Sequence, residues 1–179
     1  AEPSRTCAAP ERAPASGARA ASSAARAPSS AMRPPGGILL AMDTAQSTAD
    51  QAWLATFLSS HGGIAGTVHR RQGDDLLLTA AVHIPPPVQA IVARVPKGKG
   101  MAGLAFERNA PVQTCNLKTD TSGDVRPGAK AVDANAAVAL PVCDAKGAVR
   151  AIVGIAFKGE RELPQAELDG LAQAAGKLA

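Results

Sequence analysis

Apolar residues recur with helical spacing at two places in the chain. Ala49, Trp53 and Phe57 follow one another every four residues, which places them on one face of a helix, and the glycine pair after His61 is a typical stop. A second amphipathic pattern at the C-terminus consists of Leu168, Leu171, Ala172, Ala175 and Leu178. The pattern therefore predicts a helix at each end of the patterned region.

Between these helices the apolar residues are arranged as in strands. IAGTVHRR (64–71) and LLLTAAVHI (76–84) flank turn residues and predict a hairpin, which a run of three prolines ends. Further strands are predicted at VQTCNL (112–117), AAVALPV (136–142) and AVRAIVGIAF (148–157). Because strands follow strands without regular intervening helices, we expect an α+β fold, with a mostly antiparallel sheet of five or six strands flanked by helices.

The first 40 residues lack this patterning. Ala, Pro, Ser, Arg and Gly make up 32 of them, so this segment has too little bulky apolar surface to offset the entropy of ordering. We therefore expect a disordered tail over residues 1–40 and one domain over 41–179. Met32 and Met42 stand near the boundary, and either is a candidate translation start.

Charge and composition exclude several classes of function. Five Arg and two Glu in residues 1–40 give that segment a charge of +3, out of +4 for the whole chain, so the basic character belongs mostly to the tail. The arginines are scattered, and with three Phe, one Trp and no Tyr the chain has few rings on which bases could stack, which disfavours nucleic-acid binding.

Three cysteines form no metal-ligand spacing, and no apolar run suits a membrane span or signal peptide. We expect a cytoplasmic protein without a membrane anchor.

A glycine motif raises the question of dinucleotide binding. Gly98, Gly100 and Gly103 spell GxGxxG, and Asp120 follows at a distance suited to a ribose contact. A dinucleotide fold needs a full crossover helix after the glycines, whereas Pro111 cuts this helix after about two turns. We interpret the first two glycines as a positive-φ turn and the third as a point where the short helix approaches the sheet closely.

The order of these features resembles the GAF domain family. The segments that carry the resemblance are VPKGKGMAGLAFERNAPVQTCNL (95–117), VRPGAKAVDANAAVALPVCDAKGAVRAIVGIAF (125–157) and LPQAELDGLAQAA (163–175). With the first amphipathic helix, the likeness covers about residues 43–179. It implies a sensor or regulatory module of signal transduction that holds a small molecule between the sheet and the variable loops.

The resemblance also suggests where a ligand would be held. The candidate ligand-binding residues are His83, Cys115, Asp124, Arg126, Asp133 and Asn135. Arg126 would pair with an anionic ligand and Asn135 would hydrogen-bond it; the alternative for each is a solvated loop residue. A haem would need an axial ligand, for which His69 and His83 are candidates, although a histidine on these strands is more often hydrogen-bonded or at the surface. The scarcity of aromatic residues disfavours a large chromophore, and the sequence identifies no cofactor or metal.

One enzyme class shares this fold, the free methionine-(R)-sulfoxide reductases. Under the resemblance, their two cysteines correspond to Ala102 and Val132, so both thiols are missing. Cys143 is expected to be a small buried apolar residue. We therefore expect a non-catalytic module that acts through a partner protein or by forming a homodimer through its terminal helices, unless these helices simply pack on the sheet. The alternatives are a divergent redox enzyme that uses Cys115 and a ligand-free protein-interaction module.

Overall fold

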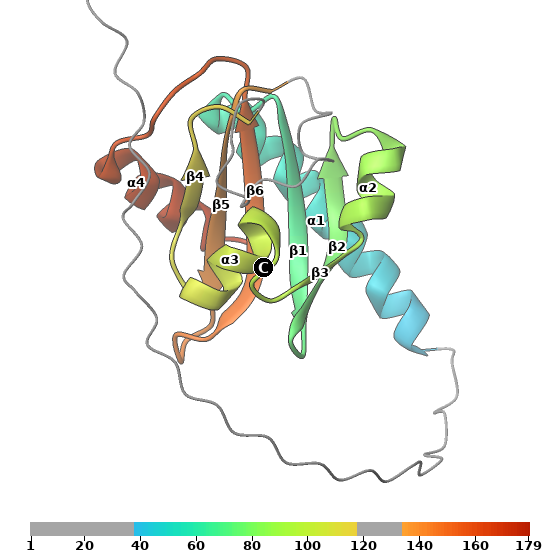
Figure 1. Cartoon of the computed structure of the whole chain (residues 1–179). Coiled ribbons are helices and arrows are strands. Elements are labelled where there is room, and N and C mark those ends of the chain that lie inside the picture. Colours follow the sequence, from blue (N-terminus) through green and yellow to red (C-terminus); the bar gives the residue numbers. More distant parts are fainter. Residues whose placement is uncertain (1–37, 118–133) are drawn as a thin grey trace, which may run out of the picture.

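The computed structural model describes residues 38–117 and 134–179. In these residues one six-stranded sheet has the strand order β3-β2-β1-β6-β5-β4, and every neighbouring pair is antiparallel (Figure 1). The strands are β1 (Ala65–Gln72), β2 (Asp75–Val82), β3 (Arg94–Pro96), β4 (Val112–Thr114), β5 (Ala136–Cys143) and β6 (Val149–Phe157). The helices are α1 (Ile38–His61), α2 (Pro86–Val92), α3 (Gly100–Arg108) and α4 (Gln165–Ala175).

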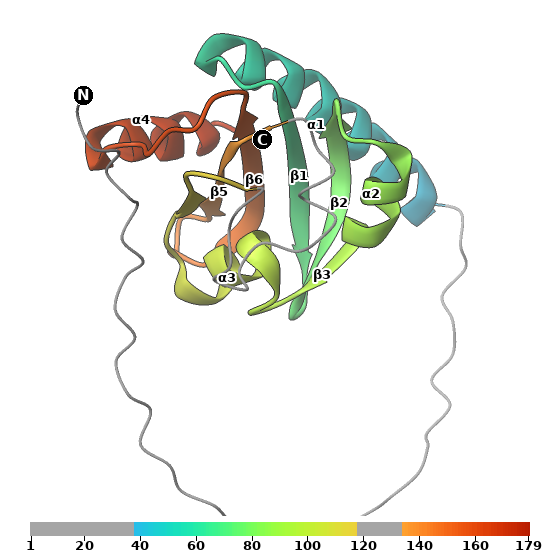
Figure 2. The same cartoon turned by 45° about the horizontal axis from the view of Figure 1, so that its top comes forward.

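The helices cover both faces of the sheet. α1 and α4 lie on one face, and α2 and α3 lie on the other (Figures 1 and 2). The predicted α+β fold is confirmed. No helix within the two described ranges combines the length and the apolar character that crossing a bilayer requires.

Most predicted elements form where the pattern placed them. α1 ends at His61, and Gly62 follows with a φ of +69°. The hairpin of β1 and β2 turns at Gly73, whose φ is +65°. The predicted strand at 112–117 is shorter, because β4 ends at Thr114 and the chain bends at Cys115. The predicted tail, apart from its last three residues, which begin α1, and the loop at 118–133 lie outside the described residues.

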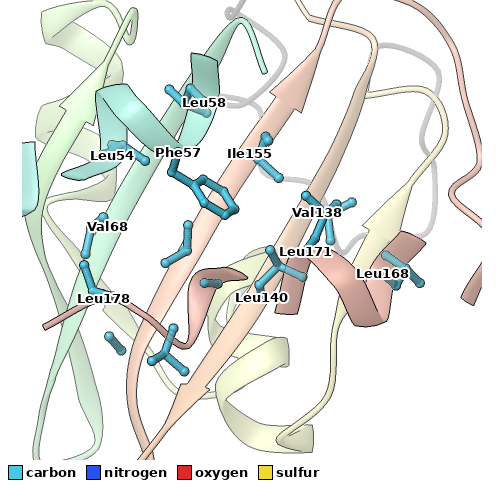
Figure 3. Packing of buried hydrophobic residues seen from close by; sticks show 14 of the residues in the cluster. Leu54, Phe57, Leu58, Val68, Val138, Leu140, Ile155, Leu168, Leu171 and Leu178 are labelled. Carbon is cyan, nitrogen blue, oxygen red and sulfur yellow. The ribbon is translucent and has the colours of Figure 1, made fainter. Parts of the chain in front are cut away.

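Large side chains fill the layer between the sheet and the helices α1 and α4 (Figure 3). The residues that pack there include Leu54, Phe57 and Leu58 of α1, Val68, Val138, Leu140 and Ile155 of the sheet, and Leu168, Leu171 and Leu178 of the C-terminal segment. The apolar faces of the terminal helices thus pack on the sheet. The sequence had left this open as the alternative to a homodimer formed through these helices. The predicted α1 face is only partly right, since Ala49 is exposed while Asp50 and Leu54 are buried.

Asp50 is a charged residue inside this apolar layer. Its side chain is 1% exposed and accepts hydrogen bonds from Arg70 at 2.5 and 3.0 Å, from Thr79 at 2.6 Å and from Gln46 at 3.0 Å. Burial by itself would raise the pKa of this carboxyl, but the hydrogen bonds and the charge of Arg70 outweigh burial and lower the pKa. Asp50 therefore joins α1 to β1 and β2 as a fully paired carboxylate.

The glycine motif has the structural role expected of it. Gly98 and Gly100 have φ values of +74° and +63° in the turn that leads into α3. A side chain at Gly103 would overlap the carbonyl oxygen of Pro96, so α3 can lie this close to the end of β3 only with glycine there. The N–H of Gly98 donates to the Gly103 carbonyl at 2.8 Å, and that of Lys99 donates to the Pro96 carbonyl at 3.1 Å. These two amides are used within the turn, which argues against a phosphate cradle.

Candidate functional site

A cavity of about 150 Å³ lies on the face of the sheet that carries α2 and α3. Its floor is formed by β1, β6 and β5, and its walls by α2, β3, α3 and the residues after β2 and β4. Floor residues include Gly66, Thr67, His69, Ala137, Ala139, Gly154 and Ala156, and the surrounding residues include Ile84, Val88, Val92, Val95, Lys99, Gly100, Met101, Ala102 and Leu117. The lining is mostly aliphatic.

The cavity exists because small residues meet across the strands. The register pairs Thr67 with Gly154 and Gly154 with Ala139, so three small residues form one row on the cavity face. A second row pairs Ala65, Ala156 and Ala137 in the same way. The alternation of side chains along each strand directs the larger neighbours of these residues to the opposite face.

Gly154 is needed at the centre of the first row. A Cβ atom there would stand 2.8 Å from the hydroxyl oxygen of Thr67, closer than ordinary van der Waals contact. The glycine therefore leaves room beside Thr67, whose side chain lines the cavity.

His69 is the buried titratable residue of the cavity floor. It is 3% exposed, and its Nε2 lies 3.0 Å from the carbonyl oxygen of Val92 in α2. Nδ1 is the one buried side-chain nitrogen or oxygen within the described residues that has no hydrogen-bond partner. Burial lowers the pKa of His69 from 6.5 to about 4, although the hydrogen bond to Val92 acts in the opposite direction. The imidazole is therefore neutral at pH 7.

Three of the six sequence-predicted ligand residues belong to the part of the chain that the structure describes, and none of these three lines the cavity. Asp124, Arg126 and Asp133 lie outside the described residues. His83 follows β2, is exposed and bonds the Ile64 carbonyl through Nδ1 at 2.8 Å. Asn135 is half-buried, and its backbone N–H donates to the Phe157 carbonyl at 2.9 Å, while Cys115 is half-buried directly after β4. Neither residue contributes to the described lining.

The prediction for Cys143 is wrong. Cys143 ends β5, where it is exposed, and its Sγ donates to Oδ1 of Asn109 at 3.1 Å. Regular alternation places Cys143 on the face of β5 opposite to the buried Val142, and the strand ends there. An apolar strand sequence does not show where the cover over that face ends, so burial of the last residue was a wrong expectation.

Sequence reasoning missed Thr67 and gave His69 no role beyond a possible haem ligand. Both residues belong to β1 and stand two positions apart, so they share one face of the strand. That spacing was visible in the sequence. The identity of the strands on either side was not, and it is the pairing with β6 that places small residues beside them.

Comparisons with known proteins agree with this architecture. A family model for the GAF domain matches residues 41–179. A search of curated protein sequences gave no match. Among solved structures, the type II free methionine-R-sulfoxide reductase from Thermoplasma acidophilum is similar with a TM-score of 0.60 and 15% identity, over 76% of this chain and 94% of that one.

Two further solved structures have the same fold. The GAF domain of a phosphoenolpyruvate-protein phosphotransferase from Coxiella burnetii gives a TM-score of 0.62 at 16% identity, over 79% of this chain and 86% of that one. The free methionine-R-sulfoxide reductase from Neisseria meningitidis gives 0.58 at 15% identity, over 79% and 81%. At these identities the structures show a shared fold alone. With the family model covering the whole patterned region, the chain belongs to the GAF domain family.

Proposed function

We propose that this protein is a non-catalytic regulatory GAF module that binds a small molecule in the cavity beneath α2 and α3. The observation that carries the proposal is the cavity itself, in which Thr67, Gly154 and Ala139 leave space at the centre of an otherwise densely packed sheet. Concave, mostly apolar sites with a few polar groups are the usual form of a small-molecule site. GAF domains often bind small molecules in signalling, which agrees with this use of the cavity.

The chemistry of the lining supports binding without catalysis. Ala102, which under the family resemblance takes the place of a sulfoxide reductase cysteine, lines the cavity and has no thiol to act as nucleophile. A free amino acid such as methionine sulfoxide carries two charged groups that need charged or strongly polar partners. In the described lining Lys99 is the only charged side chain, and it is exposed. A ligand of lower polarity suits the cavity better.

We propose that the signal passes to a separate protein or acts through a homodimer. The buried faces of α1 and α4 are already used within the chain, so a dimer would need surfaces other than the Phe57, Leu168 and Leu171 side chains. Analytical ultracentrifugation at micromolar concentration tests this part. A species of twice the chain mass supports the homodimer, and a monomer at all concentrations leaves a separate partner protein as the route.

Ligand binding is tested by native mass spectrometry of freshly purified protein, set beside its denatured mass. The matched variants are Ala156→Leu, which adds bulk to the cavity floor, and Ala52→Leu on the exposed side of α1. We expect extra mass that is lost on denaturation in the wild type and in Ala52→Leu, and bare protein in Ala156→Leu. Extra mass that persists in Ala156→Leu would place the ligand elsewhere and contradict the proposal.

A wild-type protein purified bare is then titrated with small apolar probes, because a weakly held ligand is lost during purification. Binding that Ala156→Leu abolishes supports the proposal. The absence of binding for every probe would favour the ligand-free interaction module instead.

A further inference from the structure

Two side chains of β1 bring polar atoms to the floor of the cavity, and they differ in whether a ligand can reach those atoms. Nε2 of His69 is bonded to the Val92 carbonyl at 3.0 Å, and Nδ1 is buried. Both nitrogens are therefore out of reach of a ligand, although the His69 side chain contributes to the lining. Thr67, two positions earlier on the same face of β1, is only partly buried.

The hydroxyl of Thr67 is both unpartnered and accessible. Its oxygen makes no hydrogen bond within the described residues. Nδ1 of His69 is the one side-chain nitrogen or oxygen there that lacks a partner and is also sealed from solvent. The unpartnered hydroxyl of Thr67 is therefore open to a molecule of the size of water.

The neighbouring strand shows that this hydroxyl lies on the cavity face. The Thr67 hydroxyl oxygen stands 2.8 Å from the point to which a Cβ atom on Gly154 would project. Gly154 is the residue of β6 that pairs with Thr67, and directly paired residues share one face of a sheet. Both residues line the cavity, and Gly154 leaves the oxygen uncovered on the side toward β6. Ala139, next in the row, contributes only a methyl group.

The size and charge of the cavity restrict the ligand further. An apolar cavity of about 150 Å³ accommodates a molecule the size of benzene. A hydroxyl can donate one hydrogen bond or accept one, so Thr67 suits a single neutral polar group. An ionised ligand would lose its hydration on this floor without gaining a partner of opposite charge. Lys99, the one charged side chain of the described lining, is exposed to solvent.

We propose that the cavity selects a small, uncharged and largely apolar molecule with one hydroxyl or carbonyl group, which forms a hydrogen bond with the Thr67 hydroxyl. This inference rests on the proposed function, because it names the ligand class of the same cavity. It assigns Thr67 as the residue that determines specificity and the aliphatic lining as the source of most of the affinity.

The test compares two probes of similar size on matched variants. Phenol carries a hydroxyl and toluene does not, and isothermal titration calorimetry measures the affinity of each. Thr67→Val keeps the branched shape and replaces the hydroxyl by a methyl group, so the preference for phenol over toluene should fall about threefold to tenfold. Thr67→Ser retains the hydroxyl and should retain most of the preference. Thr56→Val, the same change on the exposed side of α1, should leave it at the wild-type value.

A spectroscopic measurement on the bound probe detects the hydrogen bond itself. Benzaldehyde carries one carbonyl oxygen, which only accepts hydrogen bonds. In the wild type, the infrared carbonyl stretch of bound benzaldehyde should lie below its frequency in an alkane solvent, and in Thr67→Val it should move toward the alkane value. A bound carbonyl at its alkane frequency in the wild type would contradict the proposal without relying on any variant.

The outcomes separate this inference from the proposed function. If both probes bind and Thr67→Val leaves their ratio unchanged, the cavity is a binding site but Thr67 does not select the ligand, and the inference fails alone. Tighter binding of benzoate, a charged molecule of similar shape, than of phenol would overturn the uncharged class. If neither probe binds the wild type, the inference fails, and the mass measurement on the purified protein decides the proposed function separately.

Discussion

The two faces of the sheet are built from the same strands but from side chains of different size. Toward α1 and α4, the central strands direct Val68, Val153 and Leu140 into a closed core. Toward α2 and α3, the neighbouring positions are Thr67, Gly154 and Ala139, and a cavity remains. Strand alternation thus lets one stretch of sequence specify a stable core on one face and a binding site on the other.

The two faces also differ in whether their buried polar groups have hydrogen-bond partners. On the closed face, Asp50 has partners in Arg70, Thr79 and Gln46. On the open face, one nitrogen of His69 is bonded and the other is left without a donor. Buried polar groups are usually paired, so the second nitrogen of His69 is an exception that the closed face does not have among the described residues.

The largest contrast is expected from truncating an isoleucine on each face. Ile155→Ala removes a fully buried side chain from the closed core and should lower the free energy of unfolding by about 2–5 kcal/mol. Ile84→Ala, at the half-buried edge of the cavity, removes the same atoms from looser surroundings and should cost less than about 2 kcal/mol. Urea denaturation measures both values, and equal losses would mean that the two faces are packed alike.

The pH dependence of the free energy of unfolding should reflect the titration of His69. Its pKa is lower in the folded protein, about 4, than its ordinary value of 6.5, so between these values the unfolded chain binds the proton more readily. Stability should therefore be complete above pH 6.5 and fall by about 3 kcal/mol as the pH drops to 4. The pKa of Asp50 is lowered from 3.8, so its contribution is lost only at lower pH.

His69→Phe isolates this effect, because the variant has no group that titrates in that interval at this position. Denaturation curves collected from pH 7 to pH 4 should be nearly flat for His69→Phe compared with the wild type. An unchanged slope in the variant would show that the histidine is not buried as described.

A smaller effect is expected from enlarging an alanine on each face of β6. Ala151 is fully buried in the closed core, and Ala151→Leu should destabilise the protein by about 1–3 kcal/mol through overpacking. Ala156 lines the cavity, so the added atoms of Ala156→Leu enter existing space, and the change should stay within about 1 kcal/mol. Thermal unfolding of the pair measures the difference, and equal destabilisation would contradict a hollow face.

Much of the fold was readable from the sequence. Period-two and helical patterns located the hairpin, the late strands and the terminal helices, and the glycines of 98–103 indicated a tight turn and a close helix approach. Asp50 was not placed in the core, because a carboxylate is expected at the surface until its partners are known. Arg70 and Thr79 lie 20 and 29 residues away along the chain, and only the folded arrangement brings them to Asp50.

The site was harder to predict than the fold. A cavity is a property of several strands together, and Thr67, Gly154 and Ala139 become neighbours only through the sheet register. In a sequence, polar residues are the ones whose chemistry suggests a binding role. The described lining instead consists mainly of small and aliphatic residues, and none of these stands out in a single sequence from ordinary strand residues.

The most direct test of the account is the effect of an apolar ligand on thermal unfolding. Toluene at ten times its dissociation constant should stabilise the wild type by about 1.4 kcal/mol, and should stabilise Ala52→Leu equally. In Ala156→Leu, where the floor of the cavity is filled, the stabilisation should vanish. If Ala156→Leu gains as much as the wild type, or if the wild type gains nothing, the face beneath α2 and α3 is not the binding site that its small residues indicate.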